Sequence, residues 1–580
     1  MNIITEINNE LIKTFEKAGY KVEKVELKPS ARKDLGDYQI NDCMALASIY
    51  HANPREIAEN VVKELESNKI FTDINIAGPG FINLKLSEEY LIENINKAVN
   101  NPKDLIEKKD PKKIVIDYGG ANVAKALHVG HLRSANIGEA LKRLAKSVGY
   151  EVIGDAHLGD YGRPLGFVVK ELKERYPDLP YFDEKYEGDY SEVELPISNE
   201  DLEEIYPYAS QRAKDDEAYL EDGRDITNKI QHHERGYYDL WKKIVEISKA
   251  DIREVYNDIN VDFELWNGES DAIEYQDKLD KIIEEKNILV ESEGAKVIEV
   301  KEESDKIEIP PLLYIKSNGT ISYETTDLLT LLQRKEEINP DEIWYVVDSR
   351  QGLHFEQVFR AIEKLGLFKK EQMEHIGFGT MNGKDGKPFK TRDGGVMTLK
   401  GLIDLVYNST ITRINNDKVT EEEAPEIAKT VAIAALKYAD LVPYRETDYI
   451  FEVEKFTDIE GKTGPYILYT TIRMKSLLNN AADMDKSKIT KIEDDYKDLV
   501  LLILDLPNII NKALKTRSLN EIADYIFNIC SLYNTFYAKN KVLTEEDIEK
   551  RTNWLTMTKL TYDICSILLD ILAIKVPDKM

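Results

Sequence analysis

The stretch from Ile114 to Ile153 reads IVIDYGGANVAKALHVGHLRSANIGEALKRLAKSVGYEVI, and it decides the fold. Its first three residues form a continuous apolar run, which is typical of a parallel strand covered on both faces. A glycine-containing loop and a helical stretch follow, and a second strand-like run spans Tyr150 to Ile153. Strand, loop, helix and strand make one βαβ unit, so the sequence predicts a parallel sheet with helical crossovers.

Outward from this unit, residues 106–455 read as a Rossmann-type α/β domain. Apolar runs at 343–347 and 376–378 predict two more strands of the same sheet. Between them, a strongly acidic segment at about 170–310 has a mixed pattern and reads as an insertion in that domain.

Smaller domains flank it on both sides. Residues 1–105 predict an α+β domain, with a first helix that ends at Gly19, a helix over 54–65 and a strand over 81–86. Residues 456–580 predict an all-α bundle. Its clearest helix begins with a capping box at Ser518 and Glu521, and its apolar residues recur at helical spacing: Ile522, Tyr525, Ile526, Ile529, Tyr533 and Phe536.

Composition narrows the class of protein further. The 580 residues carry a net charge of −29, from 78 basic and 107 acidic residues, which argues against non-specific nucleic-acid binding but allows local contacts with a folded RNA. The three cysteines form no CxxC pair, so we expect neither a disulfide framework nor a zinc site. The first 20 residues lack the apolar core of a signal peptide, and the longest apolar runs are far shorter than the roughly 20 residues that span a bilayer. We expect a soluble, cytoplasmic protein without membrane contact.

The sharpest motif is His128-Val129-Gly130-His131, where the loop after the first strand meets the helix. A helix N-terminus beside a parallel-sheet edge is an anion site, and two imidazoles there can donate hydrogen bonds to phosphate oxygens. Gly130 lets a base or ribose approach the backbone. Two other interpretations stay open: the histidines are helix caps, or they form a metal pair, although no third ligand stands at a recognisable spacing.

A second motif is the basic, glycine-rich segment KDGKPFKTRDGG, which begins at Lys384 and contains Lys387 and Lys390. Such a loop can close over a triphosphate and neutralise the departing pyrophosphate. A lone basic loop is more often merely solvated, so its meaning depends on the other motifs.

Together the two motifs resemble the signature segments of class I aminoacyl-tRNA synthetases. Further segments, in order along the whole chain, resemble the arginyl-tRNA synthetase family: LGDYQIN, NVAKALHVGHLRS, HLGDYG, DSRQGLHF, GKPFKTRDGG, ALKYADL and TGPYILY. The resemblance implies activation of arginine by ATP with Mg²⁺ to arginyl-adenylate, and transfer to the terminal adenosine of tRNA-Arg by a monomeric enzyme. No nucleophilic side chain is required.

The resemblance also implies roles for individual residues. His128, Gly130 and His131 would contact ATP, and Lys390 or Lys387 the pyrophosphate, with help from Lys125. Arginine would be held by carboxylates that pair with its guanidinium and by polar neighbours: Glu269, Asp327, Tyr323, Gln351 and Asn122.

For the tRNA, the resemblance implies that the C-terminal bundle binds the anticodon loop and the N-terminal domain the tRNA elbow. Aromatic side chains suit stacking on splayed bases. The expected contacts are Tyr466, Tyr469, Arg473 and Tyr537 for the anticodon loop, and Phe81 and Asn83 for the elbow. Two alternatives remain: another class I synthetase or nucleotidyltransferase, and a catalytically silent tRNA-binding paralogue.

Overall fold

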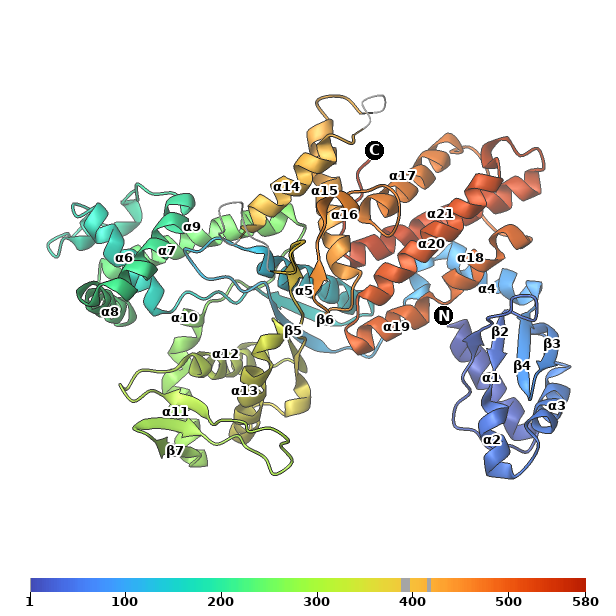
Figure 1. Ribbon diagram of the computed structural model, residues 1–580, viewed down its shortest axis with the longest axis horizontal. Helices are drawn as coiled ribbons and strands as arrows, with labels where there is room; N and C mark the ends of the chain where they lie inside the picture. The colour runs from blue at the N-terminus through green and yellow to red at the C-terminus, as the bar shows by residue number, and fades with distance from the viewer. Residues whose placement is uncertain (1, 388–396, 415–418) are drawn as a thin grey trace. The chain divides into compact units, whose positions relative to one another are not determined.

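The computed structural model describes residues 2–387, 397–414 and 419–580 (Figure 1). The chain forms two compact units. The larger unit comprises Lys109–Pro465 and Ile571–Lys575, and it is called the catalytic unit here because it contains the histidine motif predicted to bind ATP. The terminal unit comprises Met1–Lys108, Tyr466–Asp570 and Val576–Met580. No helix in the described part of the chain is both long and apolar enough to span a membrane.

The centre of the catalytic unit is a parallel four-stranded sheet in the order β11-β10-β5-β6. In the register of the sheet, Val115 lies opposite Ile343 on one side and Ile153 on the other. The two central strands β5 and β10 are buried on both faces, as the apolar runs predicted. Their bounds are β5 Lys113–Tyr118, β6 Glu151–Asp155, β10 Glu342–Val346 and β11 Met373–His375.

The prediction of a strand at 376–378 is wrong. The edge strand β11 precedes this run and ends at His375, and Phe378 makes only an isolated bridge to Asp348. Ile376 and Phe378 are apolar because they are buried as the chain leaves the sheet. At Gly377 a Cβ atom would lie 3.2 Å from the backbone of Ser349, a close approach that suits glycine.

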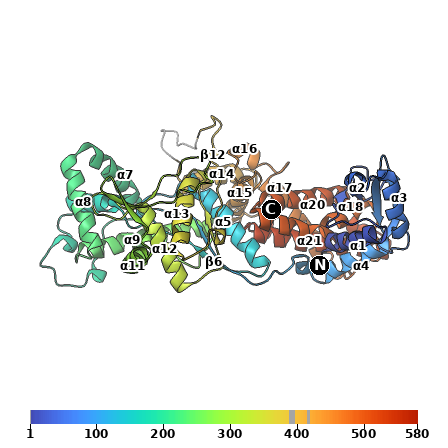
Figure 2. The same ribbon diagram turned by 90° about the horizontal axis from the view of Figure 1, so that it is seen from below.

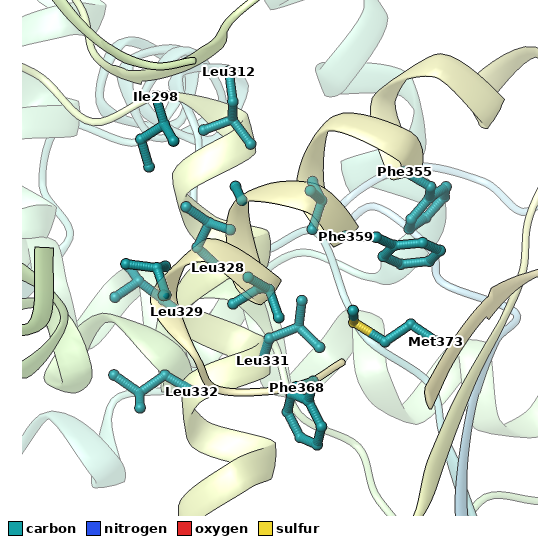
Figure 3. Packing of buried hydrophobic residues seen from close by; sticks show 14 of the residues in the cluster. Ile298, Leu312, Leu328, Leu329, Leu331, Leu332, Phe355, Phe359, Phe368 and Met373 are labelled. Atoms are coloured by element: carbon teal, nitrogen blue, oxygen red, sulfur yellow. The ribbon is translucent and has the colours of Figure 1, made fainter. Parts of the chain in front are cut away.

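Three helices join the strands. The helix α5 (Val129–Ser147) makes the crossover from β5 to β6, α12 (Tyr323–Glu337) precedes β10, and α13 (Gly352–Leu365) connects β10 to β11. The core between α12 and α13 is visible in Figure 3, where leucines of α12 face Phe355 and Phe359 of α13. Ile298 and Leu312 join this core from a small antiparallel sheet that the sequence analysis did not predict. Its strands are β7 Leu289–Ser292, β8 Ala295–Ile298 and β9 Leu312–Ile315.

The predicted acidic insertion contains a helical group with an apolar core of its own. In both ribbon views α7, α8 and α9 lie together (Figures 1 and 2). This group is joined to the catalytic centre, because the indole N–H of Trp241 donates to the carbonyl of Asp160 at 2.9 Å. The helices are α6 Arg163–Arg175, α7 Asn199–Asp215, α8 Glu217–Gln231, α9 Tyr237–Asp258, α10 Glu269–Ala272 and α11 Gln276–Lys286.

The remaining elements of the catalytic unit follow the sheet in sequence. The two short strands β12 and β13 pair in parallel, with Met381 opposite Tyr449. The helix α5 packs against α14 and α15. The bounds are β12 Met381–Asn382, α14 Leu399–Ile411, α15 Ala424–Leu441, β13 Tyr449–Ile450 and α16 Val453–Phe456.

In the terminal unit, the N-terminal part is an antiparallel sheet in the order β1-β2-β4-β3 with helices. The first helix ends at Lys17, and Gly19 follows with a φ of 91°. The predictions of a helix over 54–65 and a strand over 81–86 are confirmed. The bounds are α1 Ile3–Lys17, β1 Lys28–Pro29, β2 Tyr38–Ile40, α2 Asp42–Tyr50, α3 Pro54–Leu65, β3 Phe71–Ala77, β4 Phe81–Leu86 and α4 Glu88–Asn100.

The C-terminal part of this unit is helical, as predicted. The apolar stripe of α20 is buried from Ile522 to Phe536. The predicted capping box is absent: the Ser518 hydroxyl donates to the carbonyl of Thr516, and Glu521 pairs with Lys512 at 2.8 Å. The helices are α17 Gly464–Asn480, α18 Asp494–Leu504, α19 Leu506–Thr516, α20 Asn520–Lys539 and α21 Ile548–Ile571.

Candidate active site

A pocket of about 350 Å³ opens at the carboxyl ends of β5 and β10. In a parallel sheet this edge is where ligands bind. The pocket collects most residues that the sequence analysis proposed for ATP and arginine: Asn122, His128, Gly130, His131, Glu269, Tyr323, Asp327 and Gln351. It also collects residues that were not proposed: Asp117, His157, Asp348, Arg350, His354 and Phe378.

The two histidines of the motif cap the start of α5 through the same ring atom. Nδ1 of His128 accepts the backbone N–H of Gly130 at 3.0 Å. Nδ1 of His131 accepts the backbone N–H of His128, also at 3.0 Å. The ring centroids lie 4.0 Å apart. Capping and ligand binding therefore do not exclude each other, because each ring uses Nδ1 for the cap and keeps Nε2.

Electrostatics fixes the protonation of these rings. Burial and the charge of Lys125 lower the pKa of His128. Burial, His128 and Lys125 lower the pKa of His131 to about 3. Both rings are neutral at pH 7, and since Nδ1 is an acceptor, the single proton is on Nε2. Each ring then offers one N–H donor, which is the group that a phosphate oxygen accepts.

The part of the pocket where arginine is expected, around Glu269, Tyr323 and Asp327, gathers negative charge. Burial, Asp160 and Asp327 raise the pKa of Glu269 to about 8. Asp327, burial and Glu269 raise the pKa of Tyr323. Both shifts show that an added cation would be stabilised between these groups. A guanidinium fits this demand, because carboxylates can accept its paired N–H donors.

His354 was not proposed from the sequence, yet it contacts the same carboxylate. Its Nε2 lies 2.7 Å from Oδ2 of Asp327. Burial lowers the pKa of His354, but the hydrogen bond with Asp327 and its charge outweigh burial and raise the pKa. His354 therefore orients Asp327 toward the pocket. The residue stands in the segment DSRQGLHF, which was the available signal.

The turn that carries Glu269 is held by Asp160. Its carboxylate accepts the backbone N–H of Ser270 at 2.9 Å and the Ser270 hydroxyl at 2.6 Å. The backbone N–H of Glu269 donates to the carbonyl of Leu158 at 3.0 Å. The segment HLGDYG thus places a carboxylate from the acidic insertion at the pocket.

Below the pocket, a buried arginine joins the ends of two strands. Nη2 of Arg334 lies 2.6 Å from Oδ2 of Asp117 and 2.7 Å from Oδ2 of Asp155. Asp117 lines the pocket and Arg334 does not. The Arg334 guanidinium therefore compensates the negative charge of the Asp117 carboxylate from behind the pocket wall. No sequence pattern marked Arg334, which lies more than 170 residues from either partner.

Of the three predicted lysines, Lys125 and Lys387 are described, and neither lines the pocket. Lys390 lies outside the described residues. Lys125 and Lys387 are exposed, and the Lys125 ammonium lies 6.0 Å from the centroid of the Tyr206 ring. The residues that follow the undescribed segment are anchored at the histidine motif, because the carbonyl of Met397 accepts the N–H of Val129 at 3.3 Å.

In the terminal unit, the residues expected to contact the anticodon loop form one cluster on α17 and α20. The Arg473 guanidinium lies 4.7 Å from the ring centroid of Tyr469 and 5.4 Å from that of Tyr537. Asn534, which was not predicted, links α20 to α17. Its Oδ1 accepts a hydrogen bond from Nη1 of Arg473 at 3.1 Å, and its Nδ2 donates to the hydroxyl of Tyr466 at 3.0 Å.

The two residues expected at the tRNA elbow differ in exposure. Phe81 is half-buried at the start of β4. Asn83 is fully buried in the central strand β4. Its amide oxygen accepts Nε2 of Gln39 at 2.9 Å, and its Nδ2 donates to the amide oxygen of Asn75 at 3.1 Å. The side chain of Asn83 thus has no exposed atom for a direct RNA contact, contrary to the expectation.

Imidazole donors and carboxylates in one pocket, at the carboxyl edge of a parallel sheet, agree with the class I aminoacyl-tRNA synthetase that the motifs predicted, and the comparison with protein families shows this class. Residues 94–453 match the family model "tRNA synthetases class I (R), catalytic domain". Residues 1–86 match "Arginyl tRNA synthetase N terminal domain" and 467–580 match "DALR anticodon binding domain". The chain belongs to the arginyl-tRNA synthetase family.

Two relatives of known name and one solved structure are similar to this chain over nearly its whole length. The arginine–tRNA ligase of Alkaliphilus oremlandii is 42% identical, and the alignment covers 100% of both chains. The arginine–tRNA ligase of Agathobacter rectalis is also 42% identical, with 100% of both chains covered. The fold is similar to that of the arginyl-tRNA synthetase of Thermus thermophilus, with a TM-score of 0.79 over 99% of this chain and 100% of that one at 19% identity.

Proposed function

We propose that this chain is an arginine–tRNA ligase, which activates arginine with ATP and transfers it to the 3′-terminal adenosine of tRNA-Arg. The observation that carries the proposal is the pairing of the cation pocket at Glu269 and Asp327 with the donors of His128 and His131 in one cavity. The ligase relatives at 42% identity support the same reaction.

In the first step, a carboxylate oxygen of arginine attacks the α-phosphorus of ATP. A bond forms between them, the bond from the α-phosphorus to the bridging oxygen breaks, and pyrophosphate leaves. Glu269, Tyr323 and Asp327 hold the guanidinium, and Asn122 and Gln351 bind the polar groups of the substrate backbone. The Nε2–H donors of His128 and His131 accommodate the negative charge that develops on the phosphate oxygens.

Mg²⁺ enters this account with the nucleotide. The described residues contain no group of three or more His, Cys, Asp or Glu side chains that could hold a metal ion. Mg²⁺ commonly keeps several waters and binds through substrate phosphates, so we assign it to ATP as part of the substrate. Positive charge for the departing pyrophosphate comes from Lys387 or Lys390, with Lys125 as a further candidate.

In the second step, a ribose hydroxyl of the terminal adenosine attacks the carbonyl carbon of arginyl-adenylate, and AMP leaves. We assign residues 1–105 to the tRNA elbow, 106–455 to catalysis and 456–580 to the anticodon loop. The contacts are Phe81 at the elbow, with Asn83 acting through Gln39, and Tyr466, Tyr469, Arg473 and Tyr537 at the anticodon loop. We further propose a cytoplasmic, monomeric enzyme.

Aminoacylation of total tRNA with each of the 20 labelled amino acids tests the proposal. We expect charging by arginine alone. Charging by a different amino acid would make the chain another class I synthetase, and tRNA binding without any charging would make it a catalytically silent paralogue.

A further inference from the structure

Behind the pocket wall, the carboxylate of Asp440 is the meeting point of three segments of the catalytic unit. Oδ1 accepts Nε of Arg133 at 2.8 Å and the hydroxyl of Tyr449 at 3.0 Å. Oδ2 accepts Nδ2 of Asn136 at 3.0 Å. Arg133 and Asp440 are each only 1% exposed, so the cluster of these four residues, here the Asp440 cluster, holds a buried charge pair with its hydrogen bonds.

Two members of the Asp440 cluster lie on the helix that carries the histidine motif. Arg133 follows His131 by two residues, and Asn136 lies one turn further along α5. Asn136 also donates to the carbonyl of Lys437 at 3.0 Å. The first turns of α5, and the imidazoles that cap them, are therefore attached to α15 through Asp440.

A third member lies beside the strand that leads into the lysine segment. Tyr449 belongs to β13, and its backbone N–H donates to the carbonyl of Thr380 at 3.0 Å. Two residues further along both segments, the N–H of Phe451 donates to the carbonyl of Asn382 at 2.9 Å. Lys384 and Lys387 follow β12 directly, so the position of this strand determines where the described start of the lysine segment leaves the unit.

The Asp440 cluster also supports the pocket wall. The Arg133 guanidinium lies 5.8 Å from the ring centroid of Phe378, which lines the pocket, and 5.1 Å from that of Tyr449. Nη1 of Arg133 donates to the carbonyl of Thr447 at 3.4 Å. The cluster itself contributes no lining residue to the pocket.

We propose that Asp440 is a positioning residue for adenylate formation, which holds the histidine helix α5 at a fixed distance from the paired strands β12 and β13, after the first of which Lys384 and Lys387 follow. This inference rests on the proposed function. The histidines and the lysines act on different phosphates of one ATP molecule, so their separation determines how well the transition state is stabilised. Glu269 and Asp327, which we assign to arginine binding, lie on α10 and α12, and neither helix carries a member of the cluster.

Two substitutions of nearly unchanged volume test this assignment in the full-length protein. Asp440→Asn removes the charge that Arg133 compensates, and Tyr449→Phe removes one hydrogen bond while keeping the ring. In arginine-dependent pyrophosphate exchange with tRNA, we expect Asp440→Asn to lower kcat by about 100-fold and Tyr449→Phe by about 5-fold, as for misplaced reacting groups. The KM for arginine stays within about twofold in both, because the guanidinium pocket is untouched.

A matched control separates positioning from loss of stability. Asp305 forms a pair with Arg360 in the same unit, with side chains 7% exposed and contacts of 2.7 and 2.8 Å. Asp305→Asn therefore also removes one charge of a buried ion pair, and we expect a lower melting temperature with kcat unchanged. Melting curves and circular dichroism of all three variants establish which are folded.

The outcomes are distinct. Folded Tyr449→Phe and Asp440→Asn proteins with wild-type kcat would overturn the assignment, as would a rise in the KM for arginine alone or an equal loss of kcat in Asp305→Asn. If Asp440→Asn does not fold, Tyr449→Phe decides by the same criteria. Absence of arginine-dependent exchange in the unsubstituted protein would overturn the proposed function and this inference with it.

Discussion

The backbone N–H of His128 donates to Nδ1 of His131 at 3.0 Å, so the second histidine of the motif satisfies the backbone of the first, which is the N-cap residue of α5. His128 in turn caps Gly130 through its own Nδ1. This reciprocal arrangement fixes the ring orientations and leaves both Nε2–H groups as donors. The motif is thus a structural cap whose two Nε2–H groups can also serve as the phosphate donors that we propose.

This dual role predicts that the two functions can be separated at His128. Asparagine places an amide near the position of Nδ1 and can still cap the helix, but it has no group at the position of Nε2. We expect His128→Asn to keep its stability while adenylate formation falls about 100-fold, the usual effect of removing one transition-state donor. His128→Ala should lose about 1 kcal/mol of stability as well, because the cap is gone.

Thermal unfolding and pyrophosphate exchange on the same preparations check this prediction. Near-normal exchange by His128→Asn would show that the cap is the only role of this histidine.

The raised pKa of Glu269 predicts that the KM for arginine depends on pH. With a pKa of about 8, Glu269 is mostly protonated at pH 7 in the free enzyme, whereas guanidinium binding favours its charged form. Binding therefore releases a proton below pH 8, and the KM should fall as pH rises from 6.5 to 8 and then level off. Glu269→Gln removes the titrating group, so its KM should be higher and should lose most of this dependence. A KM that rises with pH in the unsubstituted protein would contradict the assignment.

Removal of Asp327 should act on arginine and not on ATP. We expect Asp327→Ala to raise the KM for arginine by about 100-fold, because an arginine–carboxylate contact and the partner of His354 are lost together. The KM for ATP should change by less than about twofold. Glu336→Gln, a change of an exposed carboxylate on the same helix, serves as the control and should leave both values unchanged. A defect selective for ATP would show that Asp327 faces a different substrate.

The cluster around Arg473 predicts a separate effect on tRNA. Arg473 stacks between Tyr469 and Tyr537, so Arg473→Ala removes a charge and loosens two aromatic rings. We expect the Kd for tRNA-Arg to rise about 10- to 50-fold, the range of one lost stacking or charged contact. Filter binding measures the Kd, and melting curves verify the fold. An unchanged Kd would place the anticodon loop elsewhere.

The sequence predicted the parts of the fold that depend on local pattern. The helix over 54–65 begins with Pro54 after Asn53, whose side chain caps it, and the strand over 81–86 follows a Gly-Pro-Gly turn. The predictions were wrong where a buried apolar run is not a strand, and incomplete where a strand is not buried. The run at 376–378 is buried without being a strand. In the three-stranded sheet, the short strands β7 and β8 contain exposed residues and show no clear alternation.

The candidate site also contains residues that the sequence predicted and residues that only the structure reveals. The histidine motif and the carboxylates at 269 and 327 were proposed because they stand in recognisable segments, and the structure gathers them in one pocket. Arg334 carries no local signal, because its partners are brought to it only by tertiary packing. Asp440 stands in the recognisable segment ALKYADL, but that segment does not show that Arg133, Asn136 and Tyr449 are its partners. The pattern of the strand that contains Asn83 could not reveal that its side chain is buried and bonded to Gln39 and Asn75 of the neighbouring strands.

The central claim is that one cavity activates arginine, and pyrophosphate exchange measures this most directly. The assay runs the unsubstituted protein with each of the 20 amino acids, with and without total tRNA. We predict exchange with arginine alone, and strong exchange only when tRNA is present, as the resemblance to the family implies. Exchange with another amino acid, or none with arginine in the presence of tRNA, would contradict the account.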